Sequence, residues 1–355
     1  MARSLPGHRV NLVQMETFTQ SAARMRTLAP GLLIAALVAL AASWLAEHYR
    51  TPVMLFALLL GIAVNFLSQD ERCQPGIEYA SRTILRLGVA LLGMRITFGQ
   101  IQSLGVGVLV VTAFAVALTI ASGWLLSRGA GLGAQFGALT GGAVAICGAS
   151  AALALSAVLP KEPGHERDTV MTVVSVTALS TVAMIVYPLL AALLGLDEHT
   201  AGVFLGATIH DVAQVVGAGY SISTDAGDTA TIVKLFRVAL LLPVVLVVSF
   251  LFRTRHRPGS EAVRPPLLPA FLLGFAFLVV INSSGRVPQP VSAGLQEASR
   301  WCLVTAIAAL GTKTALGDVV RVGWRPVAVI VGETLVVALF VLGGLFLLRG
   351  SALPG

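Results

Sequence analysis

The sequence predicts an all-α integral membrane protein with about 9–11 transmembrane helices. Three observations support this fold class: the composition, the recurrence of long apolar runs, and an internal repeat. Of the 355 residues, 56% are hydrophobic and 12% are charged, against roughly 25% charged in an ordinary soluble domain. A soluble core could not bury that much apolar surface, so the expected solvent is lipid.

Eleven apolar segments follow one another along the chain, and most are long enough to cross about 30 Å of hydrocarbon. They are Leu28 to Ala46, Pro52 to Leu67, Gly76 to Ile96, Leu104 to Leu126, Ala134 to Leu159, Thr169 to Leu194, Ala201 to Ile222, Ala230 to Phe252, Leu267 to Ile281, Ser292 to Leu316, and Pro326 to Leu348. Together they form one polytopic membrane domain over residues 28–350.

Residues 1–27 are polar and carry Arg3, Arg9, Arg24 and Arg26. No small-residue cleavage site follows them closely, so we interpret them as a cytoplasmic tail and not as a signal peptide. Basic residues are then more frequent in the loops on the side of the tail, which predicts an internal N-terminus and an external C-terminus in the inner membrane. The net charge of +7 is spread over short loops, so no nucleic-acid partner is expected.

The fifth and seventh segments are unusual, because one carries Gly141, Gly142 and Gly148 and the other carries a polar patch. Each is expected to be broken or re-entrant. We favour broken helices that still span, since each segment is long enough to cross. If both were re-entrant from opposite faces, Lys161 and Arg167 would move inside and the charge bias would improve.

An inverted internal repeat relates residues 52–126 to residues 267–348. Its register is a constant 218 residues over most of its length, with a small gap upstream. The matches are Ala80-Ser81-Arg82 with Ala298-Ser299-Arg300, Ala90-x-Leu92-Gly93 with Ala308-x-Leu310-Gly311, Gly99 and Gly105 with Gly317 and Gly323, and Leu58-Leu59-Leu60-Gly61 with Phe271-Leu272-Leu273-Gly274. The copies are an odd number of spans apart and so face opposite ways, as in secondary transporters; the other interpretation is an ancient duplication without functional meaning.

The strongest candidate site is the stretch from Gly206 to Ala218, which contains His210, Asp211 and Gln214. At helical spacing these three share one small, polar face with Ala207 and Gly217. Ionisable residues at bilayer depth cost at least about 2.5 to 3.5 kcal/mol, so such a pair usually lines a water-filled pathway or relays protons. The structural alternative is a satisfied hydrogen-bond cluster.

In the fifth segment, Cys147, Gly148 and Ser150 mark a point where the helix could unwind. Amides freed at a half-helix N-terminus attract an anion. Close packing through small residues explains the same pattern without a site.

Arg95 and Lys313 occupy equivalent positions in the repeat, so both could face one anion across its pseudo-two-fold axis. We favour the plainer interpretation, in which both side chains snorkel at the ends of their spans. Further charges lie within or beside apolar stretches, and we expect each to form an internal salt bridge. These are Arg86, Lys234, Arg237 and Glu333.

Cys73, Cys147 and Cys302 lie far apart in the sequence, which predicts neither disulfides nor a metal site. No phosphate-binding loop or nucleophile elbow is present, so we expect no cofactor and no enzymatic activity. The competing interpretation is a membrane-embedded enzyme with Cys147 as nucleophile and His210 and Asp211 as base and orienter. A sensory or scaffold protein is disfavoured because no sizeable soluble domain is evident.

Several motifs resemble the YeiH-type family of bacterial membrane proteins, which carry the label of sulfate exporters. They are Leu85-Arg86-Leu87-Gly88-Val89-Ala90-Leu91-Leu92-Gly93, Ile146-Cys147-Gly148-Ala149-Ser150-Ala151, Ile209-His210-Asp211-Val212-Ala213-Gln214-Val215-Val216, and Lys234-Leu235-Phe236-Arg237-Val238. The resemblance covers Pro30 to Leu348 and implies a fold related to cation/proton antiporters and anion transporters, with crossed broken helices at the midplane. Ser156 and Lys313 depart from the family pattern, which has an acidic residue and Thr there.

We therefore expect a secondary transporter of a small inorganic or organic anion, with sulfate or sulfonate export as the implied activity. A coupling proton or sodium ion, the lipid bilayer and a second copy of the chain are the expected partners. A cation/proton exchanger is the alternative. Histidine titrates near pH 6.5 when unperturbed, so His210 and Asp211 are candidates to exchange a proton in the physiological range.

Overall fold

The computed structural model describes residues 7–49, 52–252, 269–313 and 324–351. All regular secondary structure in these ranges is helical, which confirms the all-α class. The predicted basic loops in 253–268 and 314–323, with Gly317 and Gly323 of the repeat, lie outside the described residues.

The helices are α1 (Gly7–Tyr49), α2 (Val53–Ala63), α3 (Gln74–Tyr79), α4 (Leu85–Leu92), α5 (Phe98–Ser103), α6 (Gly105–Gly129), α7 (Ala134–Ala145), α8 (Ala149–Val158), α9 (His165–Leu193), α10 (Glu198–Thr208), α11 (Val212–Ile222), α12 (Thr224–Ala239), α13 (Leu241–Phe252), α14 (Ala270–Ser283), α15 (Gln289–Lys313) and α16 (Trp324–Ser351), with a 3-10 turn at Asn65–Gln69 and a π-helical turn at Ala80–Ile84.

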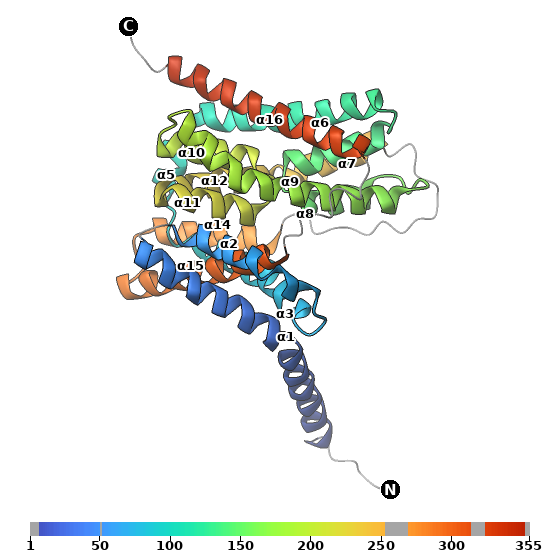
Figure 1. Cartoon of the computed structure of the whole chain (residues 1–355). Helices are drawn as coiled ribbons and strands as arrows, with labels where there is room; N and C mark the ends of the chain where they lie inside the picture. The colour runs from blue at the N-terminus through green and yellow to red at the C-terminus, as the bar shows by residue number, and fades with distance from the viewer. Residues whose placement is uncertain (1–6, 50–51, 253–268, 314–323, 352–355) are drawn as a thin grey trace.

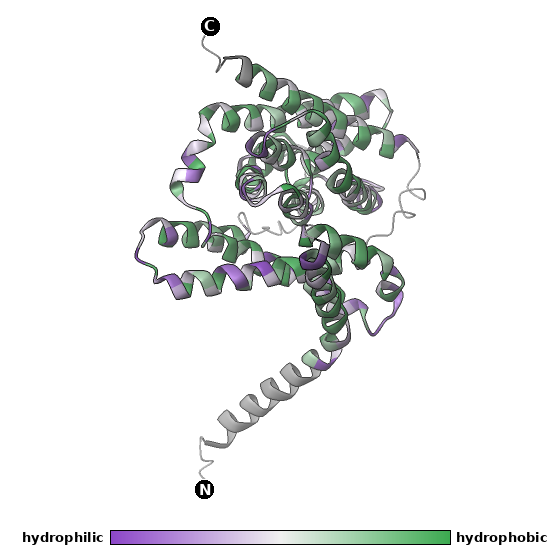
Figure 2. Cartoon of the chain, turned by 60° about the vertical axis from the view of Figure 1, so that its left-hand side comes forward, coloured by the Kyte–Doolittle hydropathy of each residue, from purple (hydrophilic) through white to green (hydrophobic). Residues whose placement is uncertain are grey.

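Five helical stretches among the described residues are long and apolar enough to cross a membrane. They are Met25–Tyr49, Gly105–Gly129, His165–Leu193, Thr224–Phe252 and Trp324–Leu348. Hydrophobic residues dominate most helices, and hydrophilic residues gather near helix ends and loops (Figure 2). The chain is thus a membrane protein with several spans, while the count of about 9–11 stays a prediction. The predicted tail is helical from Gly7 onward and continues directly into the first span.

The helices form two packed groups (Figure 1). One group, here called the panel, consists of α1 to α4, α14 and α15, with α15 packed on α1, α2 and α4. The other, the core bundle, consists of α6 to α13 and α16. Helix α11 joins the groups by packing on α2 and α15. In the core bundle, α6 packs against both α7 and α16, and α12 against both α10 and α11.

The fifth and seventh predicted segments each fold as a helical hairpin. In the first hairpin (α7 and α8), the side-chain amide of Gln135 at the start of α7 donates to the carbonyl of Pro160, just beyond α8. In the second hairpin (α10 and α11), Ser223 at the end of α11 donates to Glu198 Oε2 over 2.7 Å. The two ends of each segment therefore lie close together in the structure. Whether the segments span the membrane or re-enter it stays a prediction.

The hairpins enter the core bundle from opposite ends. The 29-residue helix α9 connects the base of the first to the base of the second, and at 1.5 Å per residue it is about 43 Å long. Each hairpin therefore reaches only part of the way into the bundle and presents its tip to the interior.

Local backbone preferences create the two tips. Gly148, the N-cap residue before α8, has φ +61° and ψ −124°, a conformation that glycine adopts far more easily than other residues. In the second hairpin, Ile209 and Asp211 are extended. The Asp211 side chain caps α11 by accepting from the Ala213 amide over 2.8 Å, which is a preferred N-cap interaction.

Candidate functional site

The two hairpin tips meet inside the core bundle. A Cβ atom placed on Gly148 would lie 3.7 Å from the backbone carbon of His210. Ile146, Ile209 and His210 have no exposed surface, and Cys147 is also buried. The Gly148 and His210 regions therefore lie in contact in the structure.

Lys234 on α12 joins the tips. Its side chain is completely buried, and Nζ donates to Ile146 O over 2.5 Å and to Ile209 O over 2.9 Å. It also donates to the carbonyl of His210. An ammonium group has three protons, so each proton has an acceptor and both tips are held by one cation.

Arg237 lies one turn further along α12 and bonds to the helix ends behind the tips. It is 1% exposed; Nε donates to Ala145 O and Nη2 to Val144 O, each over 2.8 Å. Nη1 reaches Gly206 O and Ile209 O, both at 3.1 Å. These carbonyls end α7 and α10, where the helix dipole places negative partial charge. Arg237 and Lys234 therefore neutralise two helix C-termini.

Neither cation forms the salt bridge expected from the sequence. Among the described residues the ion pairs are Glu78–Arg82, Arg95–Asp228 and Glu297–Arg300. The partners of Lys234 and Arg237 are backbone carbonyls that the helix breaks leave free, so the breaks and the cations stabilise each other.

The His210 side chain reaches α16. Its Nε2 lies 3.0 Å from Thr334 Oγ1, and the Thr334 hydroxyl is 2.8 Å from its acceptor, Ile330 O. A hydroxyl has one proton. If the Thr334 hydroxyl uses this proton to bond to Ile330 O, the bond between the ring and Thr334 must be donated by His210 Nε2–H. The ring thus ties the second tip to α16.

Asp211 and Gln214 face hydroxyl groups on α9. The Asp211 amide donates to Ser180 Oγ over 3.0 Å, and Gln214 Nε2 donates to Thr181 Oγ1 over 2.8 Å. Asp211 is only partly buried, whereas His210 has no exposed surface. Asp211 is therefore the more exposed of the two adjacent ionisable residues at this tip.

Two helices begin at the tips and point their amino ends toward this centre. Ser150 is the second residue of α8 and is exposed, whereas Gln214, in the first turn of α11, is buried. The predicted continuous helical face from Ala207 to Ala218 does not exist, because the chain is non-helical at Ile209, His210 and Asp211. These three residues form the tip of the second hairpin instead.

Comparison with known proteins now identifies the family. The sequence model of a family described as Conserved hypothetical protein 698 matches residues 30–330. The chain is 56% identical over 315 residues to a UPF0324 membrane protein of Chlorobaculum tepidum, covering 88% of each chain. It is 53% identical over 321 residues to the UPF0324 membrane protein TauZ of Paracoccus pantotrophus, covering 90% of this chain and 95% of TauZ. The chain belongs to the UPF0324 membrane protein family. No solved structure matches it.

This assignment confirms the YeiH-type resemblance seen in the sequence. The UPF0324 match from 30 to 330 includes both hairpins and α12, so the tips and their two cations lie within the shared region. Most of α16, including Thr334, follows the last matched residue.

Arg95 and Lys313 are not brought together in this UPF0324 protein. Arg95 Nε donates to Asp228 Oδ2 over 3.0 Å, and its guanidinium lies over the Tyr220 ring. Lys313 lines a separate cavity of about 190 Å³ beside Glu78. Gln296 touches Met94, next to Arg95, and Lys313 lies 17 residues further along the same helix, about 25 Å at 1.5 Å per residue. The idea that both face one anion is wrong.

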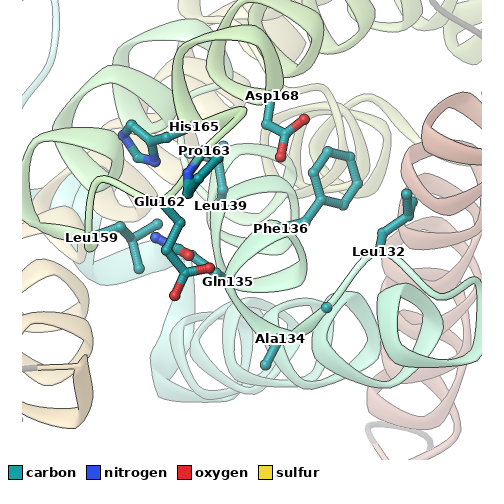
Figure 3. Close-up of a pocket in the computed structure, with 11 residues that line it drawn as sticks. Leu132, Ala134, Gln135, Phe136, Leu139, Leu159, Glu162, Pro163, His165 and Asp168 are labelled. Atoms are coloured by element: carbon teal, nitrogen blue, oxygen red, sulfur yellow. The ribbon is translucent and has the colours of Figure 1, made fainter. Parts of the chain in front are cut away.

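A larger cavity of about 250 Å³ lies at the base of the first hairpin. Figure 3 shows Gln135, Glu162, His165 and Asp168 around it. None of the residues proposed from the sequence lines this cavity, so it is distinct from the tips.

Sequence reasoning missed the hydroxyl groups that complete the site. Ser180 and Thr181 on α9 and Thr334 on α16 each bond to a tip residue or to Gln214. The sequence signal for them is weak, because threonine and serine inside a span usually bond to their own helix. Lys234 and Arg237 were recognised, but their carbonyl partners were not.

Proposed function

We propose that this UPF0324 protein is a secondary transporter of a small anion, which binds where the tips of the two hairpins meet. One observation carries the proposal: two fully buried cations, Lys234 and Arg237, bond to carbonyl oxygens and to no carboxylate among the described residues. Burying unpaired charge costs several kcal/mol per ion, so such charges usually mark a solute pathway.

The hairpin geometry supports this proposal. In the bilayer both hairpins are re-entrant, since irregular backbone is tolerated at that depth only inside protein or beside a water-filled cavity. Helices α8 and α11 begin at the tips, and helix amino ends favour negative charge. Re-entrance from opposite faces also moves Lys161 and Arg167 to the inside, which improves the positive-inside bias expected in the inner membrane.

Reciprocal packing in the panel supports the inverted repeat. A Cβ on Gly61 of α2 would press on α15 at Ala308 and Gly311. In the predicted repeat, Gly61 corresponds to Gly274 of α14, and Ala308 and Gly311 correspond to Ala90 and Gly93. A Cβ on Gly274 would lie 3.4 Å from Ala90 Cβ. The packing of α2 on α15 is thus repeated by α14 on α4, an arrangement that secondary transporters use for alternating access.

The competing functions draw less support from the contacts. For an enzymatic triad, the His210 ring should link Cys147 to Asp211, but its Nε2 bonds to Thr334 and Asp211 Oδ1 bonds to Ala213. A cation exchanger would rely on Asp211, but the same tip holds the buried cation Lys234, which bonds to the carbonyls of Ile209 and His210. We therefore assign Asp211 to positioning the tip and selecting the solute, and we propose no enzymatic role.

Flux measurements in proteoliposomes test the proposal. We expect uptake of radiolabelled sulfate or a sulfonate driven by an imposed proton or sodium gradient, with protein-free liposomes as the control. A cation exchanger predicts instead that sodium addition alone moves protons, reported by an internal pH dye, and that anion uptake is absent. That second pattern would refute the anion assignment.

A further inference from the structure

Glu333 on α16 is a buried carboxyl group with one hydrogen-bond partner. Its side chain has no exposed surface, and Oε1 lies 2.7 Å from Thr140 Oγ1 on α7. Oε2 has no partner among the described residues. The carboxyl rests against Gly123 on α6, where a Cβ would come within 2.6 Å of Oε1. Three helices therefore form a tight niche for this group.

The contacts of Glu333 favour the uncharged acid. The Thr140 hydroxyl lies 2.7 Å from Glu333 Oε1 and 3.1 Å from Phe136 O. Because a hydroxyl has one proton, Thr140 supplies at most one donor to the carboxyl group. No ion pair among the described residues includes Glu333, and a carboxylate buried there with at most one donor would cost several kcal/mol.

The niche is connected to the hairpin tips. Thr334, the next residue, bonds to the His210 ring, and Thr140 belongs to the first hairpin. A charge that appears on Glu333 must be hydrated, and hydration requires α7 and α16 to separate. That separation would disturb the contact of α16 with the second tip.

We propose that Glu333 is the proton-binding site that couples proton movement to anion transport. The inference rests on the proposed function and names the coupling ion as a proton. The carboxylic acid is neutral in the conformation seen here; when the niche opens, the O–H bond breaks, the proton passes to water and the carboxylate remains. Protonation from the other side restores the neutral acid before the niche closes again.

Glu333→Gln tests the coupling, because glutamine resembles the neutral acid but has no proton to release. In proteoliposomes we expect at least a tenfold loss of proton-driven anion accumulation and a flat pH profile. Anion counterflow at equal pH should remain within about twofold of wild type. Glu297→Gln, which removes an exposed carboxyl on α15, is the matched control and should behave as wild type. Proton-driven accumulation with a wild-type pH profile in Glu333→Gln would overturn the proposal.

A second variant guards against misfolding of the first. Thr140→Val keeps the side-chain shape and removes the partner of Glu333, so it should shift the pH profile of flux. Thr119→Val, at an equally buried threonine that bonds only within its own helix, should not. An unshifted profile in Thr140→Val would count against the proposal.

Difference infrared spectroscopy detects the proton on Glu333 directly and does not depend on transport activity. The carbonyl stretch of a protonated carboxyl should be present in the wild type and missing in Glu333→Gln. Its absence from the wild type would overturn the proton site. If the band is present but the wild type moves no anion, the proposed function fails while the proton on Glu333 stands.

Discussion

Lys234 and Arg237 lie one turn apart on α12 and divide the carbonyls of the two hairpins between them. Lys234 bonds to the tips at Ile146 and Ile209, and Arg237 to the helix ends behind them. The helix breaks create free carbonyls, which are costly in an apolar interior, and the cations satisfy them. The same two side chains therefore stabilise the helix breaks and place positive charge beside the hairpin tips.

Removing the Lys234 ammonium should destabilise the protein strongly. Lys234→Met removes the donor of Ile146 O and His210 O, while Ile209 O keeps Arg237, and each unsatisfied group costs about 1–3 kcal/mol. We expect a loss of at least about 2 kcal/mol, measured as a lower Tm in detergent. Lys313→Met, at an exposed lysine, should leave Tm unchanged. Equal Tm values for the two variants would contradict the account of the tips.

Gly148 should not tolerate a side chain, for reasons of backbone conformation and not of space. Its φ is +61°, while a Cβ would make only ordinary contacts at 3.7 Å. We expect Gly148→Ala to cost about 1–3 kcal/mol. The control is Gly129→Ala at the end of α6, where nothing lies within 4 Å of an added Cβ. If thermal unfolding shows Gly129→Ala to be less stable than Gly148→Ala, the backbone at Gly148 is not strained as described.

Asp211 should matter for transport more than for folding. Asparagine caps helices as well as aspartate does, whereas alanine loses about 1 kcal/mol. Asp211→Asn should therefore melt like wild type and carry less anion, and Asp211→Ala should lose stability as well. His210→Gln should also lower flux. Wild-type flux and pH profile in both His210→Gln and Asp211→Asn would remove the pair from the transport site and end the idea that it relays protons.

Cysteine crosslinking tests the hairpins. In a protein without Cys73, Cys147 and Cys302, a short bifunctional reagent should join Ser223→Cys to Glu198→Cys, whose native side chains are hydrogen bonded over 2.7 Å. Ser223→Cys paired with Lys161→Cys, near the base of the other hairpin, should give no product. The reverse pattern would contradict the hairpin and favour the spanning interpretation of the seventh segment.

The sequence predicted where the helices break but not how the chain continues. Gly148 and the polar residues at His210 and Asp211 mark both tips correctly, because local preferences decide a break. A hairpin and a spanning segment can have the same length and apolarity. Which of the two forms depends on contacts between residues distant in the chain, such as Gln135 with Pro160.

The charged residues show a second limit of sequence reasoning. Lys234 and Arg237 were expected to pair with acids, since the acceptors they use appear only after two helices end beside them. Arg95 and Lys313 are equivalent in the predicted repeat, but in the structure Arg95 bonds to Asp228 and Lys313 lines a separate cavity. Glu333 was recognised as a buried charge, whereas its niche against Gly123 and Thr140 depends on packing.

Counterflow of radiolabelled sulfate or a sulfonate, without any ion gradient, tests the central claim most directly. Proteoliposomes loaded with the unlabelled anion should accumulate the external label transiently and to a saturable extent. Accumulation no greater than in protein-free liposomes, for every anion tried, would contradict anion transport by this protein.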